Sequence, residues 1–171
     1  MHIRADIIVD RPIRDVFACA ADPACWTDWL SGPGRTVRGY ERPLEVGTVF
    51  VLEEDAPEYG RESLWEVIEY GPPRVLGCRR ISEGAPATVR QIFESVTGST
   101  RITLVCDVED GAPFTLGPEV EHAMVTRLSQ ALTRLKQRLE EHPAAGDSIF
   151  VHSGIGNADT EPTLLQQPND H

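Results

Sequence analysis

The sequence predicts an α+β fold, in which one curved antiparallel sheet of about seven strands packs against a long C-terminal helix. Three observations predict it. A run of β-type segments extends from Arg35 to Val108, a strand and two short helices precede it, and one long helical pattern follows it. Antiparallel strands joined by short hairpins form a single sheet, and its apolar face must be covered. The terminal helix is the only predicted element long enough to cover it.

The first three elements are recognised by composition and spacing. Residues 3–10 are rich in β-branched side chains and end at a turn, which predicts a strand. Asp10-Arg11-Pro12 opens a helix, because proline is favoured at the first helical position. This helix has one apolar face, made of Ile13, Val16, Phe17 and Ala20. A shorter helix follows Asp22-Pro23 and carries Trp26 and Trp29.

Glycine and proline separate the next six segments, which we predict to be strands. They are residues 35–42, 47–54, 62–70, 74–81, 88–97 and 100–108. Thr97-Gly98-Ser99 is short enough for a tight hairpin between the last two. The final strand alternates, with Ile102, Leu104, Cys106 and Val108 on one face. Such alternation is typical of a strand with one face on the core.

The long helix begins at Gly117-Pro118 and runs to about Glu141, roughly 36 Å at 1.5 Å per residue. Its apolar stripe is Val120, Met124, Val125, Leu128, Leu132, Leu135 and Leu139, and the opposite face carries Arg127, Gln130, Arg134 and Arg138. We therefore predict one domain over residues 1–142. Residues 143–171 contain several prolines and acids but no lysine or arginine, which predicts a flexible acidic tail.

The charge balance narrows the class of partner. The chain has 16 Lys and Arg against 27 Asp and Glu, a formal net charge of -11. Nucleic-acid binding and docking to anionic membranes both need clustered basic residues, so neither is expected. No apolar run is long enough to insert into a membrane, and the N-terminus lacks a secretion signal, so we predict a cytoplasmic protein. A hydrophobic small molecule remains as the expected partner.

Neither a metal nor a cofactor is predicted. The four cysteines (Cys19, Cys25, Cys78 and Cys106) form no C-x-x-C pair and are expected to be reduced, mostly buried thiols. No histidine is spaced with a cysteine as a zinc ligand pair, and no glycine-rich phosphate loop is present. The acids between Glu53 and Glu62 lack the spacing of a calcium loop, so they are expected to form a solvated hairpin.

Two motifs carry a resemblance to a known superfamily. The opening Ile-Ile-Val-Asp-Arg-Pro-Ile-Arg-Asp-Val-Phe-Ala, followed by Ala-Asp-Pro and Trp26-Thr-Asp-Trp29, resembles the START-like, or Bet v 1-like, superfamily (SRPBCC). So does Trp65-Glu-Val-Ile-Glu-Tyr-Gly-Pro-Pro-Arg74. The polyketide cyclase/dehydratase and lipid transport group is the most similar. This resemblance covers about residues 1–142 and implies a helix-grip fold with a deep cavity for a hydrophobic or aromatic molecule.

The alternation along the strands predicts which residues line the cavity. Trp65 is expected to point inward, as the resemblance implies, and Phe93 shares its strand face with Gln91 and Ser95. Leu76 and Cys78 look inward, which places Arg80 on the same side. Arg80 then either orients a polar ligand end or pairs with an acid at the sheet edge.

The helices supply the remaining candidates. Trp26 and Trp29 either cap the core or form a lid, and the two roles are compatible. Met124, Leu128 and Leu132 recur every four residues, so they either pack in the core or line the cavity. His122 is expected to be solvated. No catalytic residue can be assigned, and whether the protein is an enzyme stays open.

Three functions are compatible with this reading. The first is binding of a hydrophobic or aromatic molecule, such as a polyketide-type natural product or a lipid, for sequestration or transport. One version, by analogy with the superfamily, is antibiotic self-resistance, for example to an enediyne. The second is a polyketide cyclase or aromatase that uses the same cavity, and the third is an interaction module working through the tail or a sheet edge. We expect a monomer or a weak homodimer. Fold alone does not choose among these functions.

Overall fold

The computed structural model describes residues 1–30, 37–40, 42–53, 62–109 and 117–141. The predicted order of strand, two helices, six strands and one helix is confirmed. The elements are β1 (His2–Val9), α1 (Ile13–Ala20), α2 (Pro23–Trp29), β2 (Val37–Arg38), β3 (Val49–Glu53), β4 (Glu62–Gly71), β5 (Val75–Arg80), β6 (Ala87–Val96), β7 (Ser99–Val108) and α3 (Pro118–Glu141). The seven strands form one antiparallel sheet in the order β1-β7-β6-β5-β4-β3-β2, so the first and last strands are neighbours.

Some boundaries differ from the prediction for local reasons. Pro12 is the N-cap of α1 with an extended ψ of 148°, so the helix begins one residue later than the proline. Of the strand predicted over 35–42, the described residues form Val37–Arg38, and the backbone turns at Gly39, whose φ is +78°. The predicted β6–β7 hairpin is a two-residue turn, in which Thr97 and Gly98 both have positive φ.

A β-bulge in β4 decides which way its last residues point. Val67 lies opposite Cys78, but the next pair joins Glu69 to Gly77, so Ile68 is the extra residue. The bulge places the Glu69 carboxylate on the outer face, where it accepts two hydrogen bonds from the Arg90 guanidinium, at 2.9 and 3.1 Å. Strict alternation would have turned this carboxylate toward the core.

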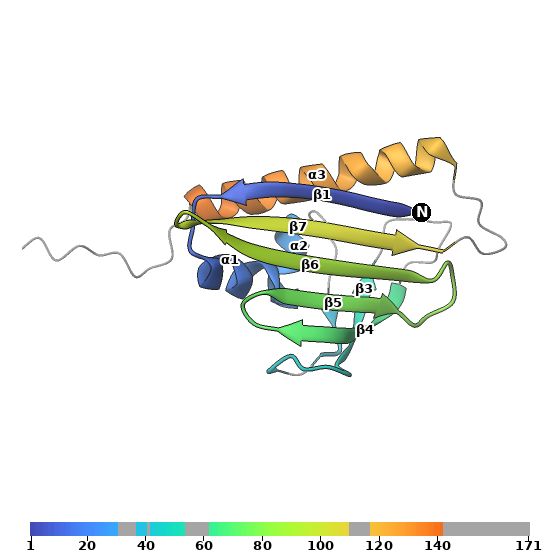
Figure 1. Ribbon diagram of the computed structural model, residues 1–171. Coiled ribbons are helices and arrows are strands. Elements are labelled where there is room, and N and C mark those ends of the chain that lie inside the picture. The colour runs from blue at the N-terminus through green and yellow to red at the C-terminus, as the bar shows by residue number, and fades with distance from the viewer. Residues whose placement is uncertain (31–36, 41, 54–61, 110–116, 142–171) are drawn as a thin grey trace, which may run out of the picture.

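Three helices share the concave side of the sheet (Figure 1). α3 runs along β1, α1 contacts β6 and β7, and α2 lies between α3 and β2. The terminal helix is therefore not the only cover, as its length had suggested. In particular, α1 places the Phe17 ring directly on Phe93, with ring centroids 5.1 Å apart.

The apolar stripe of α3 is buried over the second half of the helix only. Leu132 and Leu135 are at most 1% exposed, whereas Val120 and Val125 are exposed. The arginines predicted on the opposite face turn partly toward α2: Arg134 donates a hydrogen bond to a backbone carbonyl of α2 at 3.0 Å, and Arg138 forms an ion pair with that helix. The first half of α3 thus projects beyond the packed core.

One arginine holds the last turn of α3. The Arg11 guanidinium donates from Nε to the carbonyl of Leu139 at 3.0 Å and from Nη2 to that of Glu140 at 3.4 Å. The last carbonyls of a helix lack partners within the helix, and a cation there also interacts favourably with the helix dipole. Arg11 thus caps α3 with a charged side chain, although it lies 128 positions before Leu139 in the chain.

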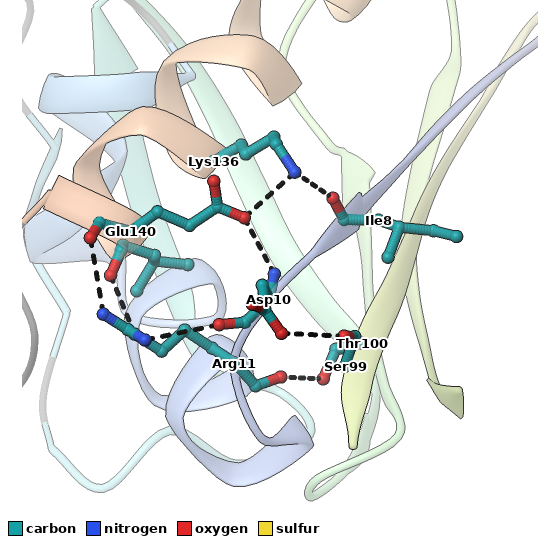
Figure 2. A network of polar contacts seen from close by, with 8 residues as sticks. Ile8, Asp10, Arg11, Ser99, Thr100, Lys136 and Glu140 are labelled. Carbon is teal, nitrogen blue, oxygen red and sulfur yellow. Dashed lines mark hydrogen bonds and ion pairs between the residues drawn. The ribbon is translucent and has the colours of Figure 1, made fainter. Parts of the chain in front are cut away.

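Further contacts surround this cap (Figure 2). Glu140 accepts a hydrogen bond from the backbone N–H of Asp10 at 2.8 Å and pairs with Lys136 at 2.9 Å. Lys136 donates to the carbonyl of Ile8 at 2.6 Å, and the Thr100 hydroxyl donates to the carbonyl of Arg11 at 2.8 Å. We call this network the clasp; its members are Ile8, Asp10, Arg11, Ser99, Thr100, Lys136, Leu139 and Glu140. It ties α3 to β1 and β7 at one end of the sheet.

Two sequence predictions concern the remainder of the chain. None of the described helices is long and apolar enough to cross a membrane. The predicted tail, residues 143–171, and most of the acidic hairpin lie outside the described residues.

Replacing the cap should destabilise the protein. We expect Arg11→Met to lower the free energy of unfolding by about 1–3 kcal/mol, because two carbonyls lose a charged hydrogen-bond donor. Urea denaturation measures the change. Arg4→Met is the control, since Arg4 lies exposed on β1, the strand that precedes Arg11. Equal losses in the two variants would show that the cap contributes nothing of its own.

The clasp also predicts a pH dependence. The Asp10 N–H and then Lys136 lower the pKa of Glu140. A carboxylate with a lowered pKa stabilises the fold above its unfolded pKa, about 4.3, and this contribution is lost as pH falls through the folded pKa. Glu140→Gln should therefore reduce stability near neutral pH and progressively less below about pH 4.3. Glu141→Gln, at an exposed neighbour, should show no such trend in unfolding measured across pH.

Candidate functional site

The concave face of the sheet gathers side chains from the four strands β4, β5, β6 and β7. The ladder register sets Trp65 opposite Arg80, Val67 opposite Cys78, and Leu76 opposite Gln91. It continues through Gln91 and Phe93 to Leu104 and Ile102 of β7. Facing residues share one side of a sheet. The concave face of the central strands consists of Ser63, Trp65, Val67, Leu76, Cys78, Arg80, Ala87, Val89, Gln91, Phe93, Ile102, Leu104, Cys106 and Val108.

Exposure changes along this face. Near the β6–β7 turn and the middle of the sheet, Leu76, Phe93, Ile102 and Leu104 are 0–1% exposed. Toward the opposite end, the residues that keep 5–9% exposure are Trp65, Cys78, Ala87, Cys106 and Val108. We call this second region the open end. The half-buried Met124 and Leu128 belong to the first half of α3, which lies toward the same end (Figure 1).

Aromatic rings from α1 and α2 pack against the concave side of the sheet, one pair at its sealed middle and one beside Trp65. Phe17 packs edge-on against Phe93, and Trp26 packs edge-on against Phe50 with centroids 5.1 Å apart. The Trp26 ring nitrogen donates to the carbonyl of Ala20 at 2.7 Å. Both tryptophans of α2 are buried, Trp29 completely. They therefore act as part of the core that backs the site.

Arg80 and Trp65 form the polar edge of the open end. The Arg80 guanidinium lies over the Trp65 ring, 5.5 Å from its centroid, and the Trp65 ring nitrogen donates to the Ser63 hydroxyl at 2.8 Å. Arg80 also lies against Gly84, where a Cβ would meet its Nη1 at 3.3 Å. The stacked geometry holds a guanidinium at the rim of an apolar surface.

Gln91 brings an amide into the sealed part of the face. It is 3% exposed, and its Oε1 has no hydrogen-bond partner among the described residues. The ring nitrogen of Trp29 is likewise buried without a partner in that part of the chain. A buried polar atom without a hydrogen bond costs about 1–3 kcal/mol, so each such atom needs an explanation. A ligand that donates to Gln91 would supply one.

The two cysteines of the face are neutral thiols. Burial raises the pKa of Cys78 to about 12 and, with the Asp107 carboxylate nearby, that of Cys106 to about 11. The reactive form of cysteine is the thiolate, so these side chains serve as apolar lining.

All ten residues that were predicted to bind the ligand lie in the described helices and strands. Trp65, Cys78, Arg80, Gln91 and Phe93 lie together on the concave face of β4, β5 and β6. Leu132 is buried in the same core, Met124 and Leu128 are half-buried on α3, and α2 supplies the two tryptophans. His122, which we expected to be solvated, is exposed.

A surface groove of about 660 Å³ was not predicted. It runs between α1 and the segment 40–44, and its lining residues are Phe17, Ala18, Ala21, Asp22, Tyr40, Arg42, Pro43, Leu44, Tyr70 and Pro72. The Nη2 of Arg42 donates to both carboxylate oxygens of Asp22, at 2.9 and 3.0 Å. Phe17, which also touches Phe93, separates this α1 groove from the concave face. The residues that line this groove are scattered along the chain. Tyr40 and Tyr70 are the sequence features that could have pointed to it.

This geometry can be compared with known proteins. A family described as "Polyketide cyclase / dehydrase and lipid transport" matches residues 1–140. The chain belongs to this family. The superfamily predicted from the sequence, START-like or Bet v 1-like, is thereby confirmed. No curated protein matches the sequence.

Solved structures share the family's fold at low identity. A START superfamily protein from Mycobacterium smegmatis has a TM-score of 0.63 at 15% identity, over 82% of this chain and 97% of its own. Ara h 8.0201 has a TM-score of 0.65 at 12% identity, over 83% and 99%. DynU16, a protein of the dynemicin biosynthetic locus, has a TM-score of 0.62 at 19% identity, over 81% and 47%. The predicted helix-grip architecture is thus confirmed.

The unsatisfied amide gives a stability test. Replacing a buried, unpartnered acceptor with an apolar group of similar shape is neutral or stabilising. We expect Gln91→Met to raise the free energy of unfolding of the ligand-free protein by up to about 1 kcal/mol. Thermal and urea unfolding measure this change. A clear loss of stability would mean that Gln91 Oε1 accepts a hydrogen bond in solution, which would contradict the structure.

Proposed function

We propose that the protein binds a hydrophobic, partly aromatic small molecule against the concave face, with access from the open end. The observation that carries this proposal is Gln91, a buried amide whose oxygen has no partner among the described residues and whose neighbours are apolar. A hydrogen-bond donor on the ligand would satisfy that oxygen. Residual exposure of Trp65, Cys78 and Cys106 supports entry at that end.

The two polar groups of the face suggest the shape of the ligand. Gln91 lies opposite Leu76, four residues along β5 from Arg80. At about 3.3 Å per residue, this places the amide and the guanidinium about 13 Å apart along the strand. A ligand with a donor at its deep end and a carbonyl or phenolate oxygen at its outer end fits both groups. Hydroxylated polycyclic ketones of polyketide type have this pattern.

Apolar burial would supply most of the affinity. Burying some 300 Å² of apolar ligand surface at about 25 cal/mol per Å² contributes roughly 7–8 kcal/mol before the entropy of association is subtracted. Micromolar affinity corresponds to about 8.2 kcal/mol net, so polar contacts must add to this burial. The Trp65, Phe93 and Leu128 side chains are the proposed contact surface, with Arg80 and Gln91 fixing orientation.

The chemical groups on the concave face favour ligand binding over catalysis. The described part of the concave face offers hydrocarbon, aromatic, hydroxyl, neutral thiol and amide groups and one guanidinium. These groups can hold and orient a ligand. The proposed roles are sequestration, transport or self-resistance toward a natural product, by a unit of residues 1–142 that acts in the cytoplasm as a monomer or weak homodimer. The alternative is a polyketide cyclase or aromatase, and the family description names a polyketide cyclase.

Titration of tryptophan fluorescence with hydroxylated polycyclic aromatic ketones tests the proposal. We expect saturable binding, weakened about 5–30-fold in Gln91→Met, which corresponds to one lost hydrogen bond of about 1–2 kcal/mol. Thr103→Val is the matched control. Thr103 is also buried with an unpartnered hydroxyl in the described structure, but it lies on the outer face of β7. This variant should leave the ligand affinity unchanged.

Two further outcomes decide the alternatives. If Tyr40→Leu abolishes binding and Gln91→Met does not, the ligand occupies the α1 groove and the proposed site is wrong. Chromatography of the recovered ligand separates binding from catalysis: an unchanged compound supports a binding protein, and a cyclised or dehydrated product supports the enzyme.

A further inference from the structure

β1 is an edge strand with a regular row of outward backbone groups. It ends the sheet and pairs with β7 over its full length (Figure 1). Met1 and Val108 exchange both of their backbone hydrogen bonds, at 2.6 and 2.9 Å. In an antiparallel ladder such pairs alternate with pairs that are not bonded to one another. The N–H and C=O groups that point away from β7 are therefore those of His2, Arg4, Asp6 and Ile8.

Little in the described structure covers this edge. β1 has neither a proline nor a bulge, two devices that blunt the edges of sheets. Among the described residues, α3 hydrogen-bonds with the edge at one end only, where Lys136 donates to the carbonyl of Ile8 at 2.6 Å. This bond agrees with the outward direction of that carbonyl. Arg4 and Asp6, nearer the middle of the strand, are exposed.

The charges of the convex face single out the same edge. Ion pairs join neighbouring strands across this face, and they include His2 with Asp107, Arg101 with Glu94, and Arg90 with Glu69. Arg4 and Asp6, by contrast, have no ion pair with any described residue. Their neighbours on β7 are the uncharged Val105 and Thr103. One cation and one anion, two residues apart on one face, are thus left at the free edge.

We infer that the β1 edge is the interface of a homodimer, in which two copies of β1 pair antiparallel about a two-fold axis at Ala5. In this register Arg4 lies opposite the second copy's Asp6, and Asp6 lies opposite its Arg4. The outward backbone groups of the two residues face one another, so they form hydrogen-bonded pairs. Charges usually keep other strands away from an edge, but here a second copy meets each charge with its opposite. A two-fold interface requires such self-complementarity.

The dimer should be weak. Each copy has a net charge of -11, which opposes association, and a single strand pair is a small interface. The pairing would set the Ile8 side chain, which is 42% exposed, beside the second copy's His2. None of the proposed ligand contacts belongs to β1, so the inference does not rest on the proposed function.

Sedimentation equilibrium over a concentration series tests the interface, at about 0.15 M salt to screen the long-range repulsion. We expect reversible association toward the mass of two chains. Arg4→Asp and Asp6→Arg each set like charges opposite one another and should weaken association about tenfold. The double variant Arg4→Asp/Asp6→Arg should restore it, and an equal mixture of the two single variants should associate as well as the unaltered chain. Arg14→Asp makes the same change of net charge as Arg4→Asp, at an exposed position of α1, and should leave association nearly unchanged.

Amide hydrogen exchange locates the contact. The N–H groups of Arg4 and Asp6 should exchange more slowly as the concentration rises, whereas those of Ile3 and Ala5 already bond to β7 and should not change. Unfolding curves at low concentration, where the dimer dissociates, check that each variant folds. The inference is overturned if the chain stays monomeric at millimolar concentration, if it associates without protecting Arg4 and Asp6, or if the double variant does not recover what the single variants lose.

Discussion

The cap that Arg11 places on the last turn of α3 is the contact on which the arrangement of this molecule depends. It joins the chain's first turn to its final described helix, and the clasp around it adds β7. Charge-assisted hydrogen bonds are roughly twice as strong as neutral ones, and here they reach carbonyls that have no acceptor role within the helix. The second half of α3 is thereby held over β1, and its Leu132 and Leu135 are buried.

Because the clasp holds one end of α3, the two ends of the concave face differ. At the clasped end, the Phe17 ring of α1 completes a dry core against Phe93. At the other end, α3 keeps Val120 and Val125 exposed, and the sheet keeps a stacked guanidinium at its rim. The proposed ligand site lies toward this second end of the concave face.

Much of this could be predicted from the sequence, since strand and helix periodicity are local properties. The shared face of Leu76, Cys78 and Arg80 followed from alternation, and the inward direction of Trp65 from the resemblance to the superfamily. The spacing of Trp26 and Trp29 predicted a shared helix face but left open whether they cap the core or form a lid. The clasp could not be predicted, because it joins residues about 130 positions apart through backbone carbonyls, which carry no sequence signal. The α1 groove likewise depends on how separate elements approach one another.

The bulge in β4 has a consequence for how this strand can vary. Ile68 is one residue more than the ladder with β5 needs, and the strand absorbs it without changing which side Val67 and Tyr70 face. A chain lacking that residue would pair Val67 and Glu69 with the same partners and keep the Glu69–Arg90 ion pair outside. We therefore expect loss of one residue to be tolerated at this point of the strand, whereas deletion of Leu64 would move Glu62 to the inward position of Ser63.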